Sequence, residues 1–436
     1  MKGPISMQQH TQTKDSHVSS ALFQFIIPIS LKASKVQHIA DFLQGNHYTP
    51  FHLNDYHSET AFYGKFHVSH KELEDFFLPI TNTILFPKTT QEKGLHRYTK
   101  SLNVEAQMQG LQTQVPFRIL SADVFICPYE LGFLTIRTEI NHQSFSQVQE
   151  FANCFRYLKN EQLNTITCGG ESYQTVRDFI FSMIFPPLQP YLCEKTNALL
   201  PPNKMYVHSF ISFHEVEVTN PMTFDELSFS YFTNEKQMET PGQITQHFGP
   251  FYYSVIINLF HQMVLIKIVK TFSEINIDKA TFDFEKLNYL INSFTSNYYF
   301  NVYPAQSLGQ ELFRQLRSTL QIEQLYSNMK ETLFSLFKFE ENIVTKRDSL
   351  LLLILTLYTV VCGIFSMNLF THDLKGNIKW NHFQSYNPFE YFAVFIVFSG
   401  IFTVFFLGLQ SLYQGLKKKK KRKEWVQENV LINKKR

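Results

Sequence analysis

The chain has 436 residues, enough for two or three domains with a sizeable core. Charged residues make up 18 % of it and the mean hydropathy is −0.15, values that exclude a transporter built only of membrane spans. The formal net charge is a small +3. A mostly soluble protein with a small membrane part is therefore predicted.

The five cysteines are odd in number and form no C-x-x-C pair, so neither a disulfide framework nor a zinc ribbon is indicated. A reducing cytosol suits them. The N-terminus is polar and lacks the apolar core of a signal peptide, so residues 1–20 are predicted to be a flexible tail on the cytosolic side.

Residues 21–245 are predicted to form a cytosolic α/β domain. Short runs rich in β-branched and aromatic residues indicate strands at 22–29, 61–68 and 205–216, and 122–140 has the pattern of a hairpin. After the hairpin, apolar residues recur at helical spacing from Phe145 to Leu158.

Residues 246–348 carry helical patterns without a convincing strand and are predicted to form a helical stalk. The stretch 251–269 is nearly all apolar, yet it holds Asn258, His261, Gln262 and Lys267, which would be costly in hydrocarbon. We predict a long helix packed inside an oligomer or against the α/β domain. A second helix is predicted from Leu308 to about Val344.

Two uncharged or nearly uncharged runs, 349–370 and 389–413, are predicted to be transmembrane helices joined by an outer loop, 371–388. The first run has 22 residues and would span roughly 33 Å at about 1.5 Å per residue. The predicted fold is thus α+β with a membrane part: a cytosolic α/β domain, a long stalk and a C-terminal two-helix transmembrane hairpin.

The tail, 414–436, begins with seven consecutive cations, Lys417 to Lys423, and Lys346 and Arg347 precede the first predicted span. The positive-inside rule places both termini in the cytoplasm of a multi-pass protein of the inner (plasma) membrane. Such a run can also bind nucleic acid. Its position beside a membrane favours anionic lipids as the partner and no nucleic acid.

Within the first predicted span, Thr356, Thr359, Gly363 and Ser366 are spaced by 3, 4 and 3 residues and share one helical stripe, and Asn368 is expected to end the helix. Two helices cannot enclose a pore, so a pore would need several copies of the chain. Rings of neutral oxygens suit a strongly hydrated cation such as Mg²⁺. The alternative is a close helix–helix contact whose hydroxyls bond to their own backbone.

These residues resemble the CorA-type magnesium transporters, whose first span ends in a G-M-N triplet and whose basic tail is followed by Trp. Here the triplet reads Ser366-Met367-Asn368, and Trp425 follows the basic run. The resemblance covers about 251–425 and implies a homopentamer that passes divalent cations through a pore gated from the cytosol. The outer loop is not acidic, because its one acidic residue, Asp373, is outnumbered by Lys375 and Lys379. Such a loop concentrates divalent cations poorly, so the transported ion could be Mg²⁺, Co²⁺, Ni²⁺ or Zn²⁺.

Outside the predicted membrane spans, the sequence contains other candidate functional features. Five histidines fall between His47 and His70, but ordinary exposed or strand-borne histidines are favoured over a metal site. Glu340 and Glu341 could form an inner acidic ring or a solvated face of the stalk. The sequence has no P-loop, G-x-S-x-G or dinucleotide motif, so no enzyme and no covalently bound cofactor is predicted, and Mg²⁺ or another divalent cation is expected as the transported ion and as a candidate regulatory ligand. The competing function is a membrane-tethered oligomeric sensor or scaffold without ion transport.

Overall fold

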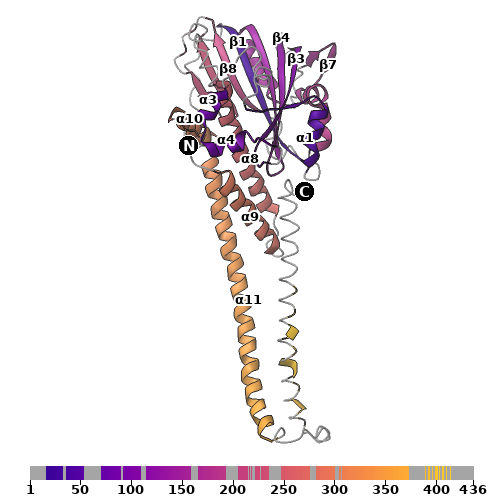
Figure 1. Ribbon diagram of the computed structural model, residues 1–436, viewed down its shortest axis with the longest axis vertical. Coiled ribbons are helices and arrows are strands. Elements are labelled where there is room, and N and C mark those ends of the chain that lie inside the picture. Colours follow the sequence, from indigo (N-terminus) through magenta and orange to yellow (C-terminus); the bar gives the residue numbers. More distant parts are fainter. Residues whose placement is uncertain are drawn as a thin grey trace. The chain divides into compact units, whose positions relative to one another are not determined.

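The computed structural model describes residues 16–32, 36–53, 70–89, 92–109, 114–158, 165–192, 205–214, 216, 218, 221–225, 227–234, 247–274, 281–299, 304–305, 307–372 and separate positions between 388 and 413 (Figure 1). They fall into two compact units. Unit 1 comprises Met1–Ile275 and Leu287–Met329, and unit 2 comprises Asn276–Lys286 and Lys330–Arg436.

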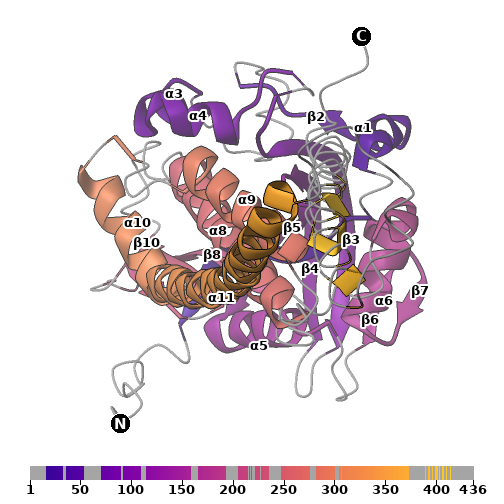
Figure 2. The same ribbon diagram turned by 90° about the horizontal axis from the view of Figure 1, so that it is seen from below.

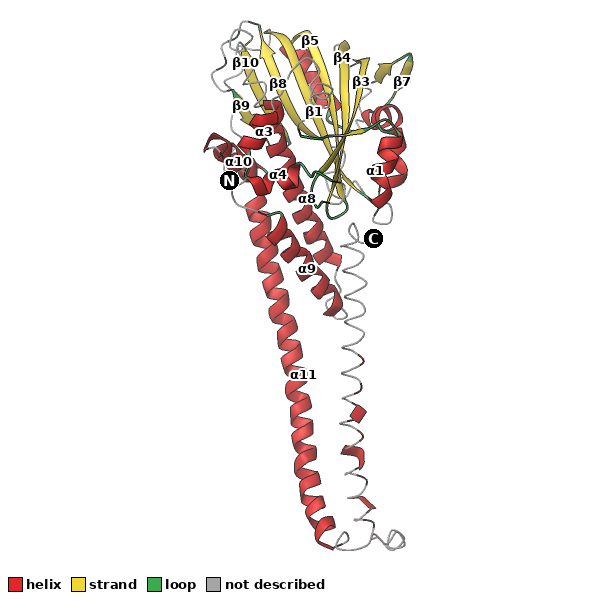
Figure 3. Cartoon of the chain, viewed as in Figure 1, coloured by secondary structure: helices red, strands yellow, loops and turns green. Residues whose placement is uncertain are grey.

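Unit 1 is built on a ten-stranded sheet in the order β7-β6-β3-β4-β5-β1-β8-β10-β9, with β2 beside β3 (Figure 3). All its neighbours pair antiparallel except β8 and β10, which are parallel. The strands are β1 (His17–Ser30), β2 (Thr49–Pro50), β3 (His96–Gln109), β4 (Gln114–Cys127), β5 (Leu131–Ser144), β6 (Thr165–Cys168), β7 (Glu171–Tyr173), β8 (Tyr206–Phe213), β9 (Met222–Phe224) and β10 (Ser228–Asn234). Mixed α/β composition is confirmed.

One face of the sheet is apolar and forms the main core. Alternate residues such as Phe25, Phe117 and Ile136 point to this face and pack with Phe151 and Phe155 of α5 (Phe145–Phe155). The α5 helix begins where the sequence places it, because Ser144 and Gln147 form a reciprocal capping box. Further helical segments of unit 1 are α1 (Val36–Gly45), α3 (His70–Phe76), α4 (Pro79–Leu85), α6 (Val176–Phe179), η2 (Ile180–Ile184) and η3 (Pro186–Tyr191).

The opposite face of the sheet lies against η6 (His247–Phe251) and α8 (Tyr252–Glu274), as Figure 2 shows from below. Among the described residues one helix, His247–Ser273, is long and apolar enough to cross a membrane, but 61 % of its most apolar window is buried inside the protein. Side chains from Tyr252 to Phe260 are almost completely inaccessible. Of the two environments predicted for this stretch, the interior of an oligomer or the α/β domain, the structure shows packing against the sheet of the α/β domain.

Three further helices follow: α9 (Thr281–Asn297), α10 (Ser307–Thr319) and α11 (Ile322–His372). The single helix predicted from Leu308 to Val344 is wrong, because the chain turns at Gln321, whose φ is +52°. Gln262 donates to the carbonyl of Leu320 at 3.1 Å and so satisfies a group that the break leaves open. Beyond this break α11 runs for 51 residues, with no interruption at the predicted boundary after 348.

Other predictions fare differently. The strand at 22–29, the hairpin at 122–140 and the strand at 205–216 correspond to β1, β4–β5 and β8. The predicted tail is too long, because β1 begins at His17 and pairs with β5 from its first residue. The strand predicted at 61–68 lies outside the described residues.

Candidate functional site

The predicted polar stripe lies on α11, in unit 2. Thr356, Thr359 and Gly363 are all exposed in the single chain. A β-carbon built at Gly363 meets no atom within 4 Å, so the described residues leave room beside it. At about 100° per residue, these three positions fall within a sector of roughly 60° on the helix. The structure therefore brings them together on one face, as predicted.

The two threonine hydroxyls bond to the backbone of their own helix. Thr356 Oγ1 donates to the carbonyl of Leu352 at 2.7 Å, and Thr359 Oγ1 donates to the carbonyl of Leu355 at 2.8 Å. Each hydroxyl proton is thereby used, while the lone pairs of the oxygen remain available. In this rotamer Thr356 and Thr359 offer hydrogen-bond acceptors, and no hydroxyl donor, to whatever contacts them.

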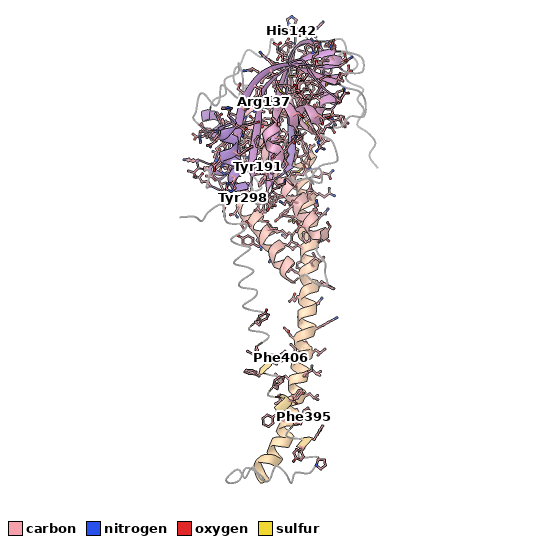
Figure 4. The ribbon with its side chains drawn as sticks, turned by 90° about the vertical axis from the view of Figure 1, so that its right-hand side faces the viewer. Arg137, His142, Tyr191, Tyr298, Phe395 and Phe406 are labelled. Carbon is pink, nitrogen blue, oxygen red and sulfur yellow. The ribbon has the colours of Figure 1, made fainter. Side chains whose placement is uncertain are left out.

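The rest of α11 at this level is apolar and exposed. The exposed fraction is 68 % for Leu353, 63 % for Leu357 and 56 % for Val360. These three side chains share a sector of about 60°, and Leu351, Ile354 and Leu355, which are 38 %, 36 % and 45 % exposed, point in other directions, so water would meet apolar surface on several sides of the helix. Aromatic residues described between 391 and 413 are similarly exposed, among them Phe395 and Phe406, labelled in Figure 4. A surface of this size needs a cover in the working protein.

The triplet Ser366-Met367-Asn368 lies within α11, but its side chains are outside the described part. The prediction that Asn368 ends the helix is wrong, since α11 continues to His372. An asparagine within a helix costs well under 1 kcal/mol relative to alanine, and the following Leu369 and Phe370 continue the apolar run. Asn368 is therefore about one turn before the helix end.

The remaining predicted site residues are only partly described. Glu340 and Glu341 are both in α11, and the side chain of Glu341 is exposed, while that of Glu340 lies outside the described residues. Adjacent helical residues point about 100° apart, so these two carboxylates cannot face a common axis equally. Asp373, the loop after His372 and the run Lys417 to Lys423 lie outside the described residues.

The five histidines from His47 to His70 are not seen as a cluster. His47 lies in the turn after α1 with φ of +66°, and His52 follows β2, whereas His57 and His67 lie outside the described part. His70 is the first residue of α3. Among the described residues, no three His, Cys, Asp or Glu side chains are placed to hold a metal ion.

Sequence reasoning missed a buried polar layer in unit 1, between the sheet and α8. Asp123 of β4 is at its centre: it accepts from Arg97 at 2.7 Å and from Thr99 at 2.8 Å, and Arg137 lies 3.4 Å away. All four side chains are almost completely buried. Figure 4 shows the location of Arg137 in the sheet. Cross-strand register brings them together, so sequence separation conceals the cluster.

Aromatic residues of α8 complete this layer. Tyr253 accepts from Arg97 at 2.6 Å, and Tyr252 donates to Thr135 at 3.1 Å. The guanidinium carbons of Arg97 and Arg137 lie 5.5 and 5.3 Å from the Tyr252 ring centroid, within cation–π range. Burial is the main cause that raises the pKa of Tyr252 to about 12, so it stays a neutral donor. The layer fixes α8 to the sheet.

Three histidines are buried in unit 1. His208 and His247 lie near Tyr252 of the polar layer, and His261 lies further along α8. His208 and His247 stack at 4.3 Å, and His208 Nδ1 lies 2.6 Å from Gln24 Oε1. Burial lowers the pKa of His247 to about 3 and that of His208 well below its usual value. Burial and then Arg317 lower the pKa of His261 to about 3. These imidazoles are neutral at physiological pH.

Taken together, the geometry provides two distinct polar features: an exposed acceptor stripe in unit 2 and a closed, internally paired layer in unit 1. Of these two features of the described residues, the stripe is the exposed one. Comparison with protein-family models, with characterised proteins and with solved structures finds no match.

Proposed function

We propose that this protein is an oligomeric membrane channel that passes divalent cations along the α11 stripe. One observation carries the proposal: the side chains of Thr356 and Thr359 are exposed on a helix that also exposes apolar side chains in several other directions. Lipid would cover the apolar faces, and a water-filled axis would meet the stripe.

The proposed unit 2 is a two-helix transmembrane hairpin, 349–370 and 389–413, with both termini cytoplasmic. The described positions from 391 to 413 are helical and carry exposed Phe, Tyr and Leu side chains, which supports a second span. Because two helices cannot surround an axis, the channel is a homo-oligomer, proposed as a pentamer on the resemblance to CorA-type transporters.

Cations are the proposed cargo because of the hydrogen-bond geometry of the stripe. Both threonine protons are directed to backbone carbonyls, so the lining presents oxygen lone pairs. These lone pairs can accept hydrogen bonds from the water molecules that surround a hydrated cation. Mg²⁺ gives up its hydration water reluctantly, so it would pass the stripe with that shell largely intact. Mg²⁺ is therefore the first ion to test, followed by Co²⁺, Ni²⁺ and Zn²⁺.

The test is flux into liposomes that contain the purified protein, with each of these four ions and with Na⁺ as a comparison. Thr359→Val keeps the shape of the side chain but replaces the acceptor with a methyl group, so we expect flux to fall at least about tenfold through dewetting. Asn368→Ala should also lower flux while the oligomer persists.

Leu357→Ala is the matched control, because Leu357 is 63 % exposed on another face of the same helix. It should leave ion preference unchanged. Wild-type protein that forms oligomers but passes none of the four ions would instead support a membrane-tethered sensor or scaffold. Unaltered flux in both Thr359→Val and Asn368→Ala would contradict conduction along the stripe.

A further inference from the structure

Among the described residues of unit 2, α11 and the second apolar segment approach each other closely at Gly400. Gly400 is buried although most described residues around it are exposed. A β-carbon built at Gly400 would lie 3.3 Å from Cδ1 of Tyr358 and 3.5 Å from Sγ of Cys362. Both neighbours are on α11, one turn apart. We name these three residues the Gly400 seam.

The Gly400 seam and the polar stripe occupy different faces of α11. At about 100° per residue, the direction midway between Tyr358 and Cys362 is roughly 110° from the mean direction of Thr356, Thr359 and Gly363. The two glycines differ accordingly: a β-carbon meets side chains at Gly400 and nothing within 4 Å at Gly363. Among the described residues, the close approach is therefore at the seam and not at Gly363.

We propose that Gly400 is a positioning residue, which sets the rotation of α11 about its own axis and so directs the threonine stripe away from the second segment. This inference rests on the proposed channel function for its consequence, but the contact itself is independent of ion flux. A side chain at position 400 would push on Tyr358 and turn the stripe relative to its partners in the oligomer. Since the lining oxygens would then move, ion preference should change together with rate.

The contact can be tested by cross-linking. Gly400→Cys places a second thiol beside the native Cys362, at a distance that a disulfide spans with a small adjustment. Mild oxidation in detergent should join the two positions within one chain, at least about ten times faster than in Phe398→Cys, because thiols held in contact react intramolecularly. Phe398 is 67 % exposed and serves as the control. Peptide mapping should identify the bond, and Cys362→Ser should abolish it.

A second measurement covers the case in which the cysteine variant folds poorly. Gly400→Ala should have a lower thermal midpoint than Gly363→Ala, because alanine favours the helix at both positions but only the β-carbon at position 400 makes a described neighbour, Tyr358, shift. Adding Tyr358→Ala should make room and remove that difference. Gly363→Ala should keep or raise the wild-type midpoint, because its β-carbon meets no described atom within 4 Å.

The positioning role itself is read from ion preference in liposomes. Gly400→Ala should change the ratio of Mg²⁺ to Co²⁺ flux at least about twofold, a ratio that does not depend on how much protein is folded, and Tyr358→Ala should restore it. An absent cross-link, or a midpoint lowered by Gly363→Ala and not by Gly400→Ala, overturns the seam. An unchanged ratio overturns positioning. Wild-type protein without flux overturns the channel and leaves the cross-link result standing.

Discussion

At the scale of single residues, Asp123 has the largest predicted effect on stability. It is fully buried and is the shared partner of Arg97 and Arg137. Asp123→Ala would leave two guanidinium groups in the interior without their carboxylate, so the free energy of unfolding should fall by about 3–5 kcal/mol. Urea unfolding followed by circular dichroism measures this.

The control is Glu311→Ala, which removes an exposed partner of Arg314 on α10 and should leave the midpoint of urea unfolding unchanged. Equal effects of the two variants would show that the buried layer contributes no more than a surface ion pair does.

The buried histidines predict how stability depends on pH. Burial lowers the pKa of His247 to about 3 in the folded chain, against an ordinary histidine value of about 6.5. Between these values the unfolded state binds the extra proton, so this contribution is complete above about pH 6.5 and is lost as pH falls, by up to about 1.4 kcal/mol per pH unit. His247→Phe should flatten the decline in thermal midpoint between pH 6.5 and 4.

Phenylalanine suits this position because His247 lies among aromatic rings and its Nε2 makes no hydrogen bond to the described residues. A pH profile identical to that of the wild type would contradict the assignment of the decline to His247.

At the scale of elements, the junction of β4, β5 and β1 depends on a glycine. A β-carbon at Gly132 would lie 2.6 Å from the carbonyl oxygen of Phe125 and 3.1 Å from Ile29. Gly132→Ala must therefore displace backbone and should lower the free energy of unfolding by about 1–3 kcal/mol. Gly45→Ala, at the end of α1 with no atom within 4 Å, should be neutral or stabilising. The thermal midpoints of both variants test this prediction, and a midpoint of Gly132→Ala as high as that of Gly45→Ala would contradict it.

What the sequence could predict also differs by element. A run rich in β-branched and aromatic residues identified β1, alternation identified the β4–β5 hairpin, and apolar residues at helical spacing identified α5. The break at Gln321 could not be predicted, because the residue is neither Gly nor Pro and its stability depends on Gln262 from another helix.

In the candidate site, too, features set by local spacing could be predicted from the sequence, whereas features set by distant contacts could not. Spacing alone placed Thr356 and Thr359 on one face, because that depends only on helical period. The Gly400 seam depends on contact between distant segments, and the polar layer around Asp123 depends on strand register. Neither has a local signal in the sequence.

At the scale of the whole molecule, the proposed channel predicts a homo-oligomer. Native mass spectrometry in mild detergent should show several copies, with five expected. A monomer that retains ion flux would contradict the proposal, since one hairpin cannot enclose a path.

Topology gives a separate prediction at this scale. A thiol introduced by Asn377→Cys, in a background from which Cys362 has been removed by Cys362→Ser, should react with an impermeant reagent added to intact cells. Reaction only after permeabilisation would place this loop in the cytosol and reverse the orientation. The same reagent on Cys362→Ser alone gives the background.

The uninterrupted course of α11 has a mechanical consequence. Within unit 2, α11 runs from Lys330 to His372, about 64 Å at about 1.5 Å per residue. A helix without a joint acts as a lever, and a tilt of about 1° at Lys330 displaces the His372 end by about 1.1 Å at that length. The same tilt moves Thr356 and Thr359, which lie between these ends, by about 0.7 Å.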